Sequence, residues 1–401
     1  MDSLTQITLG AAVGEVVLGK KIGNRALLWG AVGGTIPDLD VIGNFFMSEV
    51  DSLAFHRGIS HSIFFAVIAS IIIGWIIKNF YKSEYYRYLA FLGWAAFTGG
   101  ILILINIILK KPSIHLLAFG LSAALYIYLI VRLARRYIFN PSAELPEATT
   151  REWQWLFFWT IFTHPLLDAF TTYGTQLFQP FSDYRVAFNT ISVADPIYSI
   201  PFLMCVIICS FFNRKSEKRK WINYAGLIMS SLYLTFTVFN KMRIDSTFEK
   251  SLKKQGIVYE RYMTTPTILN NVLWSGIAQS GDTYYLGSYS LFDTQEIKFT
   301  ALKQNENMLQ NSSDDRTVRI LKWFTNGYYN VITRKDGKLQ MNDLRYCSLN
   351  NNYLDEDSYV FRFPLEQNEN GNYDVLDSDC GPPEGSEKEM MSILIERIKG
   401  N

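Results

Sequence analysis

The sequence has few of the residues that usually carry redox chemistry or metal binding. Its 401 residues include only four histidines and four cysteines, and the net charge is +1. This balance provides no basic surface for nucleic acid, so nucleic-acid binding is excluded as a function class. No phosphate-binding glycine loop, dinucleotide fingerprint or Gly-x-Ser-x-Gly turn is present, which leaves metal-assisted chemistry as the main enzymatic option.

Charge is also scarce in the first part of the chain. Up to about residue 240, long apolar runs alternate with short basic loops, and the rest is polar and rich in Tyr, Asn and Asp. A bilayer core requires about 20 apolar residues per helix. We predict a polytopic α-helical membrane bundle of about six to eight segments at residues 1–244, then a small soluble α+β domain at residues 245–401. The strongest spans are 62–80, 88–109, 114–131, 153–170, 197–212 and 221–240.

Two shorter, glycine-rich segments precede these spans, at residues 4–18 and 26–37. The Gly10-x-x-x-Gly14 spacing would let a neighbouring helix approach closely. No basic n-region precedes the first segment, so we expect a retained helix and not a cleaved signal peptide.

Lys and Arg are unequally divided between alternate loops. One set of loops has fifteen basic residues, with the densest group at 214–220, and the other set has four. Because cytoplasmic loops carry the excess of Lys and Arg, we predict that the first set is cytoplasmic. The soluble domain would then lie outside the cytoplasm of a bacterial inner membrane.

The C-terminal region reads as a mixture of short strands and one helix. Alternating stretches at 282–289, 318–324, 328–333 and 359–363 predict strands of an antiparallel sheet, and the apolar spacing within 387–399 predicts a terminal helix. Cys347 and Cys380 could pair in an oxidising compartment or remain separate thiols. Cys205 and Cys209 lie in an apolar segment and are expected to be inert packing residues.

Three of the four histidines lie in motifs at the predicted outer ends of apolar segments. Acidic and imidazole groups beside hydrocarbon are unfavourable unless they are paired, and a divalent metal is the simplest partner of a His/Asp cluster. The orientation rests on Lys and Arg alone, so the shared side is independent support for one site. The motifs are Pro37-Asp38-Leu39-Asp40, His56-Arg57-Gly58-Ile59-Ser60-His61, His164-Pro165-Leu166-Leu167-Asp168 and Asp195-Pro196.

The histidine motifs also have structural interpretations. His164 and Asp168 are four residues apart on a helix, which suits two ligands of one metal or a polar pair at a helix end. His56 and His61 are either ligands or interfacial histidines, and Ser60 could cap the helix that follows.

The remaining polar residues divide in the same way. Arg57 could hold an anionic substrate group or anchor on lipid phosphate. Asp38 and Asp40 could turn inward together or form an Asx-turn. Asp195 is expected to cap the next helix, with support of a ligating histidine as the alternative. His115 is interpreted as an interfacial residue.

At these positions the chain resembles the YdjM-type family of bacterial inner-membrane proteins, described as metal-dependent hydrolases. The resemblance covers about residues 1–245. Many members have Thr-His where this chain has Thr5-Gln6, and the Gln6 amide oxygen could coordinate weakly or hold a water. The family looks distantly similar to zinc-dependent phospholipase C and nuclease folds, which implies phosphoester chemistry. The matching stretches are Met-Asp-Ser-Leu-Thr-Gln, Gly-Thr-Ile-Pro-Asp-Leu-Asp, His-Arg-Gly-Ile-Ser-His-Ser, Thr-His-Pro-Leu-Leu-Asp and Asp195-Pro196.

These observations predict a membrane-bound, metal-dependent hydrolase that acts on a lipid or lipid-linked phosphoester at the outer face of the cytoplasmic membrane. Zinc is the expected metal, and the bilayer and a lipid substrate are the expected partners. The alternative is a non-catalytic metal- or lipid-binding membrane protein whose soluble domain recruits a partner. The expected metal ligands are Asp38, His56, His61, His164 and Asp168, and the expected catalytic residues are Asp40, as ligand or general base, and Arg57.

Overall fold

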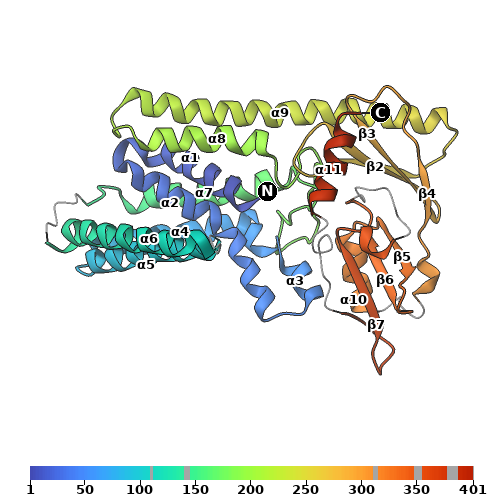
Figure 1. The fold of residues 1–401 in the computed structure, drawn as a ribbon, viewed down its shortest axis with the longest axis horizontal. Coiled ribbons are helices and arrows are strands. Elements are labelled where there is room, and N and C mark those ends of the chain that lie inside the picture. Colours follow the sequence, from blue (N-terminus) through green and yellow to red (C-terminus); the bar gives the residue numbers. More distant parts are fainter. Residues whose placement is uncertain (109–111, 140–144, 310–314, 347–354, 377–386, 401) are drawn as a thin grey trace. The chain divides into compact units, whose positions relative to one another are not determined.

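The computed structural model describes residues 1–108, 112–139, 145–309, 315–346, 355–376 and 387–400. The chain divides into two compact units (Figure 1). The larger unit contains Met1–Ala69 and Leu156–Asn401, and the smaller unit contains Ser70–Trp155.

The smaller unit is helical and very apolar. It contains most of α4 (Ile63–Lys82), all of α5 (Tyr86–Ile108) and α6 (Pro112–Ala134), the π-helical turn η3 (Arg135–Phe139) and the start of α7 (Thr150–Asp168). The α5 and α6 helices pack together, and the Tyr126 hydroxyl donates to the Ala95 carbonyl at 3.3 Å. Tyr81 stacks on Trp153, with ring centroids 5.7 Å apart.

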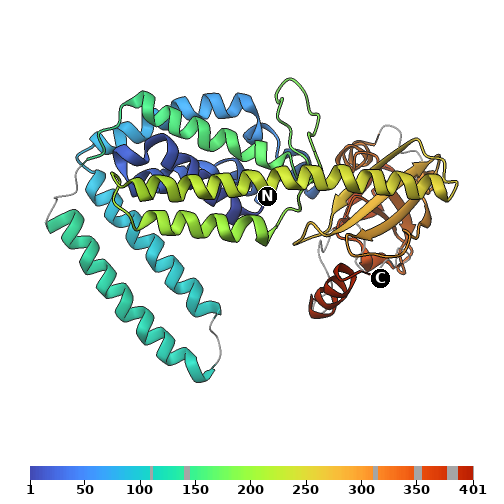
Figure 2. The ribbon, with the colours of Figure 1, turned by 90° about the horizontal axis from the view of Figure 1, so that it is seen from above.

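The helical part of the larger unit comprises α1 (Ser3–Ile22), α2 (Asn24–Thr35), the later part of α7, α8 (Pro196–Ser210) and α9 (Glu217–Lys254). These helices lie side by side (Figures 1 and 2). A Cβ on Gly10 would lie 2.3 Å from the Gly30 carbonyl oxygen, and one on Gly14 would lie 2.4 Å from the Ala26 carbonyl oxygen. The close helix approach predicted from the glycine spacing is therefore confirmed, because only hydrogen fits at these positions.

Three short elements connect α2 to α4: the 3₁₀ helices η1 (Pro37–Phe45) and η2 (Ile59–His61), and α3 (Glu49–Phe55). Pro37 begins η1, where its fixed φ is favourable. The cap of α4 is Ser62, whose Oγ accepts from the Phe65 amide at 3.0 Å. Ser60, expected as that cap, instead donates to Asp40 Oδ2 at 3.0 Å.

After α9 the chain forms two four-stranded antiparallel sheets, each in simple sequence order. The predicted membrane helices followed by a small α+β domain therefore describe the layout. The strands are β1 (Arg261–Pro266), β2 (Leu273–Ser280), β3 (Thr283–Ser290) and β4 (Thr300–Lys303), then β5 (Tyr329–Thr333), β6 (Leu339–Asp343), β7 (Arg362–Gln367) and β8 (Tyr373–Val375). The other elements are the short η4 (Glu306–Met308) and η5 (Glu356–Ser358), and the helices α10 (Arg316–Phe324) and α11 (Glu387–Ile398).

The strand predicted at 318–324 is wrong, because this segment is helix α10. Asp315 caps it and accepts from the Val318 amide at 2.9 Å. Val318, Leu321 and Phe324 are buried together, and their spacing of three residues places them on one helical face. Alternating side chains gave this short run the same appearance as a strand.

The long connection between α7 and α8 packs against the strand domain within the larger unit. The Tyr173 ring lies 5.3 Å from the Phe324 ring. The Thr172 and Thr265 hydroxyls are hydrogen-bonded, and Asn271 donates to the Thr190 carbonyl at 2.8 Å. This connection follows directly after Asp168, so the strand domain helps to fix the chain beside a predicted site residue.

Among the described residues, α4, α5, the α6–η3 segment and α9 are long and apolar enough to cross a membrane. The α8 helix is apolar but has only 15 residues, and α7 is a helix that does not meet the same criteria. The predicted number of six to eight segments is therefore not confirmed. The predicted domain boundary at 244/245 lies inside α9, which runs unbroken to Lys254. Cys347 and Cys380 lie outside the described residues.

Candidate metal centre

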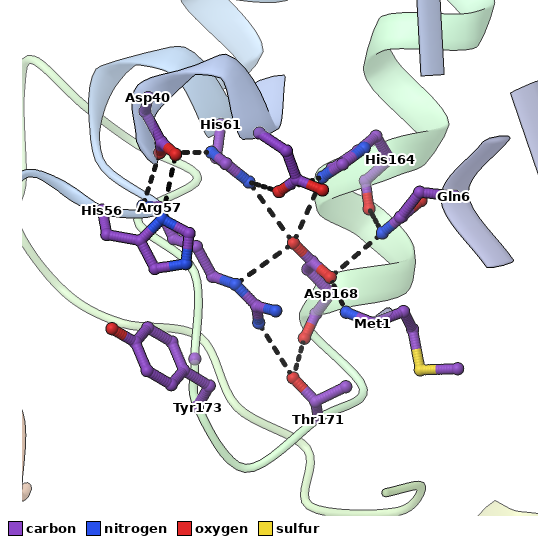
Figure 3. Close-up of polar contacts among 12 residues, drawn as sticks. Met1, Gln6, Asp40, His56, Arg57, His61, His164, Asp168, Thr171 and Tyr173 are labelled. Atoms are coloured by element: carbon purple, nitrogen blue, oxygen red, sulfur yellow. Dashed lines mark hydrogen bonds and ion pairs between the residues drawn. The ribbon is translucent and has the colours of Figure 1, made fainter. Parts of the chain in front are cut away.

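Four predicted ligands converge where η1, η2 and α7 meet (Figure 3). Asp38 comes from η1, His61 from η2, and His164 and Asp168 from the last turns of α7. One ligand atom from each of these residues can be chosen so that all four lie within 4.8 Å of one another. Three of the four residues are buried, so the group sits inside the protein and not on a solvated acidic surface.

The distances within this group suit a metal ion better than direct hydrogen bonds. His61 Nε2 lies 3.4 Å from both Asp38 Oδ1 and Asp168 Oδ2. His164 Nε2 lies 3.3 and 3.4 Å from the same two oxygens. Charge-assisted N–H···O bonds are normally about 2.7–2.9 Å. A tetrahedral ion with bonds of about 2.0–2.1 Å would hold its ligand atoms about 3.3 Å apart.

Several atoms that face this point are buried and have no hydrogen-bond partner. They include His61 Nε2, His164 Nε2 and Asp168 Oδ2. Buried polar atoms are rarely left unpaired, and each one is unfavourable by about 1–3 kcal/mol. Two imidazoles and two carboxylates are also a donor set that divalent transition metals accept. The residues present therefore fit a metal.

The outer nitrogens of both histidines are held so that the inner nitrogens face the group. His164 Nδ1 lies 2.6 Å from the Gly34 carbonyl oxygen. A carbonyl can only accept, so Nδ1 carries the proton and Nε2 is available for a metal. His61 Nδ1 lies 3.0 Å from the Ser60 hydroxyl oxygen and 3.3 Å from Asp40 Oδ2.

Asp40 lies behind the group and organises the chain around it. Its side chain is only 1% exposed. Oδ1 lies 2.9 Å from His56 Nδ1, and Oδ2 accepts from the Arg57 amide at 2.9 Å and from the Ser60 hydroxyl at 3.0 Å. Asp40 thus fixes the 56–61 segment, including His61, from one buried carboxylate.

Asp168 is shared between the group and the N-terminal helix. Its Oδ1 accepts from Gln6 Nε2 at 3.0 Å and pairs with the Met1 α-amino group. Gln6 Nε2 also donates to the His164 carbonyl at 3.2 Å. Gln6 Oε1 is buried and has no hydrogen-bond partner. The amide therefore orients Asp168 and keeps one acceptor free near the centre.

Arg57 borders the group in a strained backbone conformation. Its φ of 57° lies in the left-handed region, which is uncommon for a residue other than glycine. Its Nε lies 3.4 Å from Asp168 Oδ2, and Nη1 donates to Thr171 Oγ1 at 3.1 Å. The guanidinium also lies 4.8 Å from the centre of the Tyr173 ring.

The carboxylates and His61 perturb one another strongly. Burial alone would raise the pKa of Asp38 and Asp40, but the neighbouring histidines outweigh burial and hold both pKa values well below the usual range. For His61 burial would lower the pKa, but Asp168, Asp38 and Asp40 together raise it to about 9. Near neutral pH the metal-free centre therefore has ionised carboxylates and a protonated His61.

The comparison with family models decides the family. The model of the YdjM inner membrane protein family matches residues 1–109 and 113–244. The chain belongs to the YdjM family. Comparison with curated proteins and with solved structures gives no match. All residues of the centre lie inside the family match. The strand domain, which is the chain that follows α9, lies beyond it.

Within this family member, the structure groups four of the five predicted ligands and places His56 apart from them. The His61 and His164 rings are 5.0 Å apart. The His56 ring is 6.1 Å from that of His61, and it contacts Asp40 and Tyr173. Asp195 caps α8 as expected, accepting from the Ile197 amide at 3.0 Å.

Some residues of the centre could not be identified from side-chain chemistry. The Gly34 carbonyl and the Met1 amine are backbone groups, and no pattern of residue types marks them. Thr171 contacts Arg57, and its only sequence signal is its position three residues after Asp168.

Proposed function

We propose that this YdjM-family membrane protein is a metal-dependent hydrolase that cleaves a lipid or lipid-linked phosphoester. The buried group of Asp38, His61, His164 and Asp168 is the observation that carries the proposal. It combines ionised carboxylates, imidazoles fixed by hydrogen bonds to their outer nitrogens, and inner atoms without partners. Zinc is the metal that we propose, since a mixed nitrogen and carboxylate set with a fourfold arrangement suits it.

A divalent ion held by these four residues would supply Lewis acidity and make a water molecule a better nucleophile. The rest of the reaction depends on residues of the chain. Asp40 holds His61 and His56 in place, and it is engaged by several donors. It therefore acts through the two histidines, and we assign proton exchange to His56. The His56 side chain is 27% exposed and its Nδ1 faces Asp40, an arrangement typical of a general acid or base.

Arg57 is proposed to bind the anionic part of the substrate. Its guanidinium lies beside Asp168 and is held by Thr171 and Tyr173. A planar guanidinium matches a phosphoryl group through paired N–H donors. The strained backbone at Arg57 fits a position selected for function, because such strain persists only where the surrounding structure enforces it.

The proposed location of the reaction is the outer face of the inner membrane. The support is the excess of Lys and Arg in the loops opposite to the His/Asp motifs. The strand domain would then lie outside the cytoplasm, since it packs on the connection that follows Asp168. Accessibility labelling of cysteines introduced at residues 216 and 258 from each membrane side tests this orientation.

The function is tested by metal analysis of the purified full-length chain, followed by a phosphate-release screen with lipid phosphoesters. The expected result is about one metal ion per chain and turnover that requires Asp38, His61, His164 and Asp168. His115→Ala is the matched control for loss of a histidine. A bound metal without turnover of any lipid phosphoester contradicts the hydrolase and favours the non-catalytic binding protein. Absence of metal contradicts the hydrolase and a metal-binding protein, and leaves the lipid-binding protein of the alternative.

A further inference from the structure

Exposed apolar side chains occur next to the metal centre, on the same segment that supplies two of its carboxylates. Along η1, Asp38 and Asp40 face inward, whereas Leu39 is 52% exposed and Ile42 is 50% exposed. At the end of η1, Phe45 is 83% exposed and Phe46 is 85% exposed. Residues that face the centre and exposed apolar residues are therefore immediate neighbours along η1.

A second exposed group adjoins the first through η2. The η1 and η2 helices pack together, and η2 leads directly through Ser62 into α4. Phe64, in the first turn of α4, contacts Phe181 edge-on at 6.2 Å, and Phe181 is 84% exposed. The apolar edge is defined here as Leu39, Ile42, Phe45, Phe46, Phe64 and Phe181.

The hairpin of η1 and α3 is held against the strand domain by residues of α3 that are not part of the apolar edge. Asp51 of α3 pairs with Arg316 of α10 at 2.6 Å, and Leu53 packs against the core formed by α10 and the second sheet. Gly43 lies against the Phe55 ring, which closes the hairpin. The two faces of the hairpin thus differ: one is anchored through Asp51 and Leu53, and the other is apolar and exposed in the part of the chain that the structure describes.

The apolar edge is continuous with a surface already assigned to the membrane. Phe64 and Val67 are exposed on α4, which is long and apolar enough to span a bilayer. No charged residue occurs from Val41 to Met47. Short apolar helices with aromatic side chains insert at the boundary between lipid head groups and acyl chains. A bilayer is the occupant that these observations favour, because a soluble partner would have to compete with lipid beside α4.

We propose that the apolar edge inserts into the bilayer at the end of α4 nearest the metal centre and that an amphiphilic lipid reaches the centre from there. Resting on the proposed function, the second part deepens it: the substrate class becomes a membrane-resident lipid with at least one acyl or prenyl chain. Its apolar chain remains along Leu39 and Ile42 while its phosphoester reaches Asp38 and Arg57.

Photocrosslinking tests the surface directly. Benzoylphenylalanine is placed at Phe46 or Phe181 of the full-length chain in phosphatidylethanolamine and phosphatidylglycerol vesicles, and the intact mass is measured after irradiation. The expected result is a phospholipid adduct at both positions. The matched control is Val258, which is 80% exposed after α9 in the strand domain, and it should give no adduct. A crosslinked dimer, an internal crosslink without lipid, or equal lipid labelling at Val258 overturns the proposal.

Activity measurements test the delivery of substrate. Phe45→Ser with Phe46→Ser should lower turnover of a vesicle-embedded lipid phosphoester by about tenfold or more, with unchanged metal content and unchanged turnover of a short-chain soluble phosphoester. Equal losses with both substrates overturn delivery from the membrane. If the metal-loaded wild type cleaves neither substrate, the proposed function and the delivery step fail together, and the crosslinks still decide whether the edge contacts lipid.

Discussion

The helical part of the larger unit contains two buried charged clusters that differ in how completely they are paired. One joins Glu15 of α1 to Arg219 of α9. Arg219 Nε and Nη2 each donate to a Glu15 carboxylate oxygen at 2.6 Å, and Nη1 donates to Asn24 Oδ1 at 2.6 Å and to the Phe212 carbonyl at 2.9 Å. All three nitrogens of that guanidinium therefore have partners within the protein, and four of its five N–H donors are used.

The candidate metal centre is also largely buried but incompletely paired. His61 Nε2, His164 Nε2 and Asp168 Oδ2 face one another at distances longer than hydrogen bonds and have no partner. A closed cluster such as that of Glu15 and Arg219 has no capacity for a ligand, whereas the open one has unpaired buried atoms that could hold an ion. Burial of charge alone does not separate structural from functional groups; the pairing of individual atoms does.

The largest expected effect is loss of metal from the open cluster. His164→Ala removes one of four ligands, so metal affinity should fall by more than about 100-fold. The fold should persist, because among the described residues the His164 side chain is hydrogen-bonded through Nδ1 alone, to the Gly34 carbonyl. Metal content per folded chain is measured after gel filtration, with Arg219→Met as the contrasting variant. Full retention of metal by His164→Ala would contradict the assignment.

The closed cluster should respond in the opposite way. Arg219→Met leaves the Glu15 carboxylate buried and unpaired, which should lower the free energy of unfolding by about 3–5 kcal/mol without loss of metal from the folded fraction. Thermal unfolding in detergent measures the first quantity and metal analysis the second. Adding Glu15→Leu should recover much of the stability. If Arg219→Met also lost metal, the two clusters would be coupled and the contrast between them would not hold.

Asp40 should have an intermediate effect because it acts from behind His61. Asp40→Asn keeps the side-chain shape but weakens the hold on His61 Nδ1 and the Arg57 amide. Metal affinity should fall by about 10- to 100-fold. Competition with a chelator of known affinity measures the change. Thr5→Ser in α1 is the control, and its metal affinity should stay close to that of the wild type. An affinity equal to wild type for Asp40→Asn would exclude an orienting role.

The smallest expected effect is the dependence of metal affinity on pH, and its direction follows from the pKa of His61. Since neighbouring carboxylates raise the pKa of His61 to about 9, a metal must displace a proton below that pH. Metal affinity should therefore increase with pH, by up to about tenfold per unit, and level off near pH 9. The metal-free protein should show the reverse: His61⁺ stabilises it below the unfolded pKa of about 6.5, and this contribution is lost as pH rises through about 9. Affinity that is flat from about pH 6 to 9 would contradict a protonated His61.

Much of the centre could be predicted because its ligands are rare residue types in an apolar context. His61, His164, Asp38 and Asp168 each interrupt or border an apolar run, and the resemblance to the YdjM family pointed to the same positions. His56 shows the limit of that signal. It lies in the same six-residue motif as His61, and only the geometry shows that its Nδ1 is directed to Asp40. Sequence spacing does not determine which ring nitrogen faces which partner.

The fold was predictable where periodicity extends over many residues and less so in short elements. The α4, α5 and α6 helices follow their predicted spans closely, whereas α9 extends well beyond the predicted 221–240, to Lys254. The α10 helix has nine residues, too few for its period to be separated from that of a strand without knowledge of the surface it covers. The cap of α4 is Ser62 and not Ser60 for a related reason, since caps shift by one or two residues with the local turn.

The packing of Tyr173 against Phe324 has a consequence for the evolution and engineering of this chain. The family match ends at residue 244, yet the compact unit that holds the metal centre continues through the strand domain. The Arg57 guanidinium packs on the Tyr173 ring, and the Tyr173 ring packs against the Phe324 ring. The strand domain thus supports one side of the centre through these contacts. A chain cut at the family boundary would keep every metal ligand and lose the surface against which one wall of the centre is built.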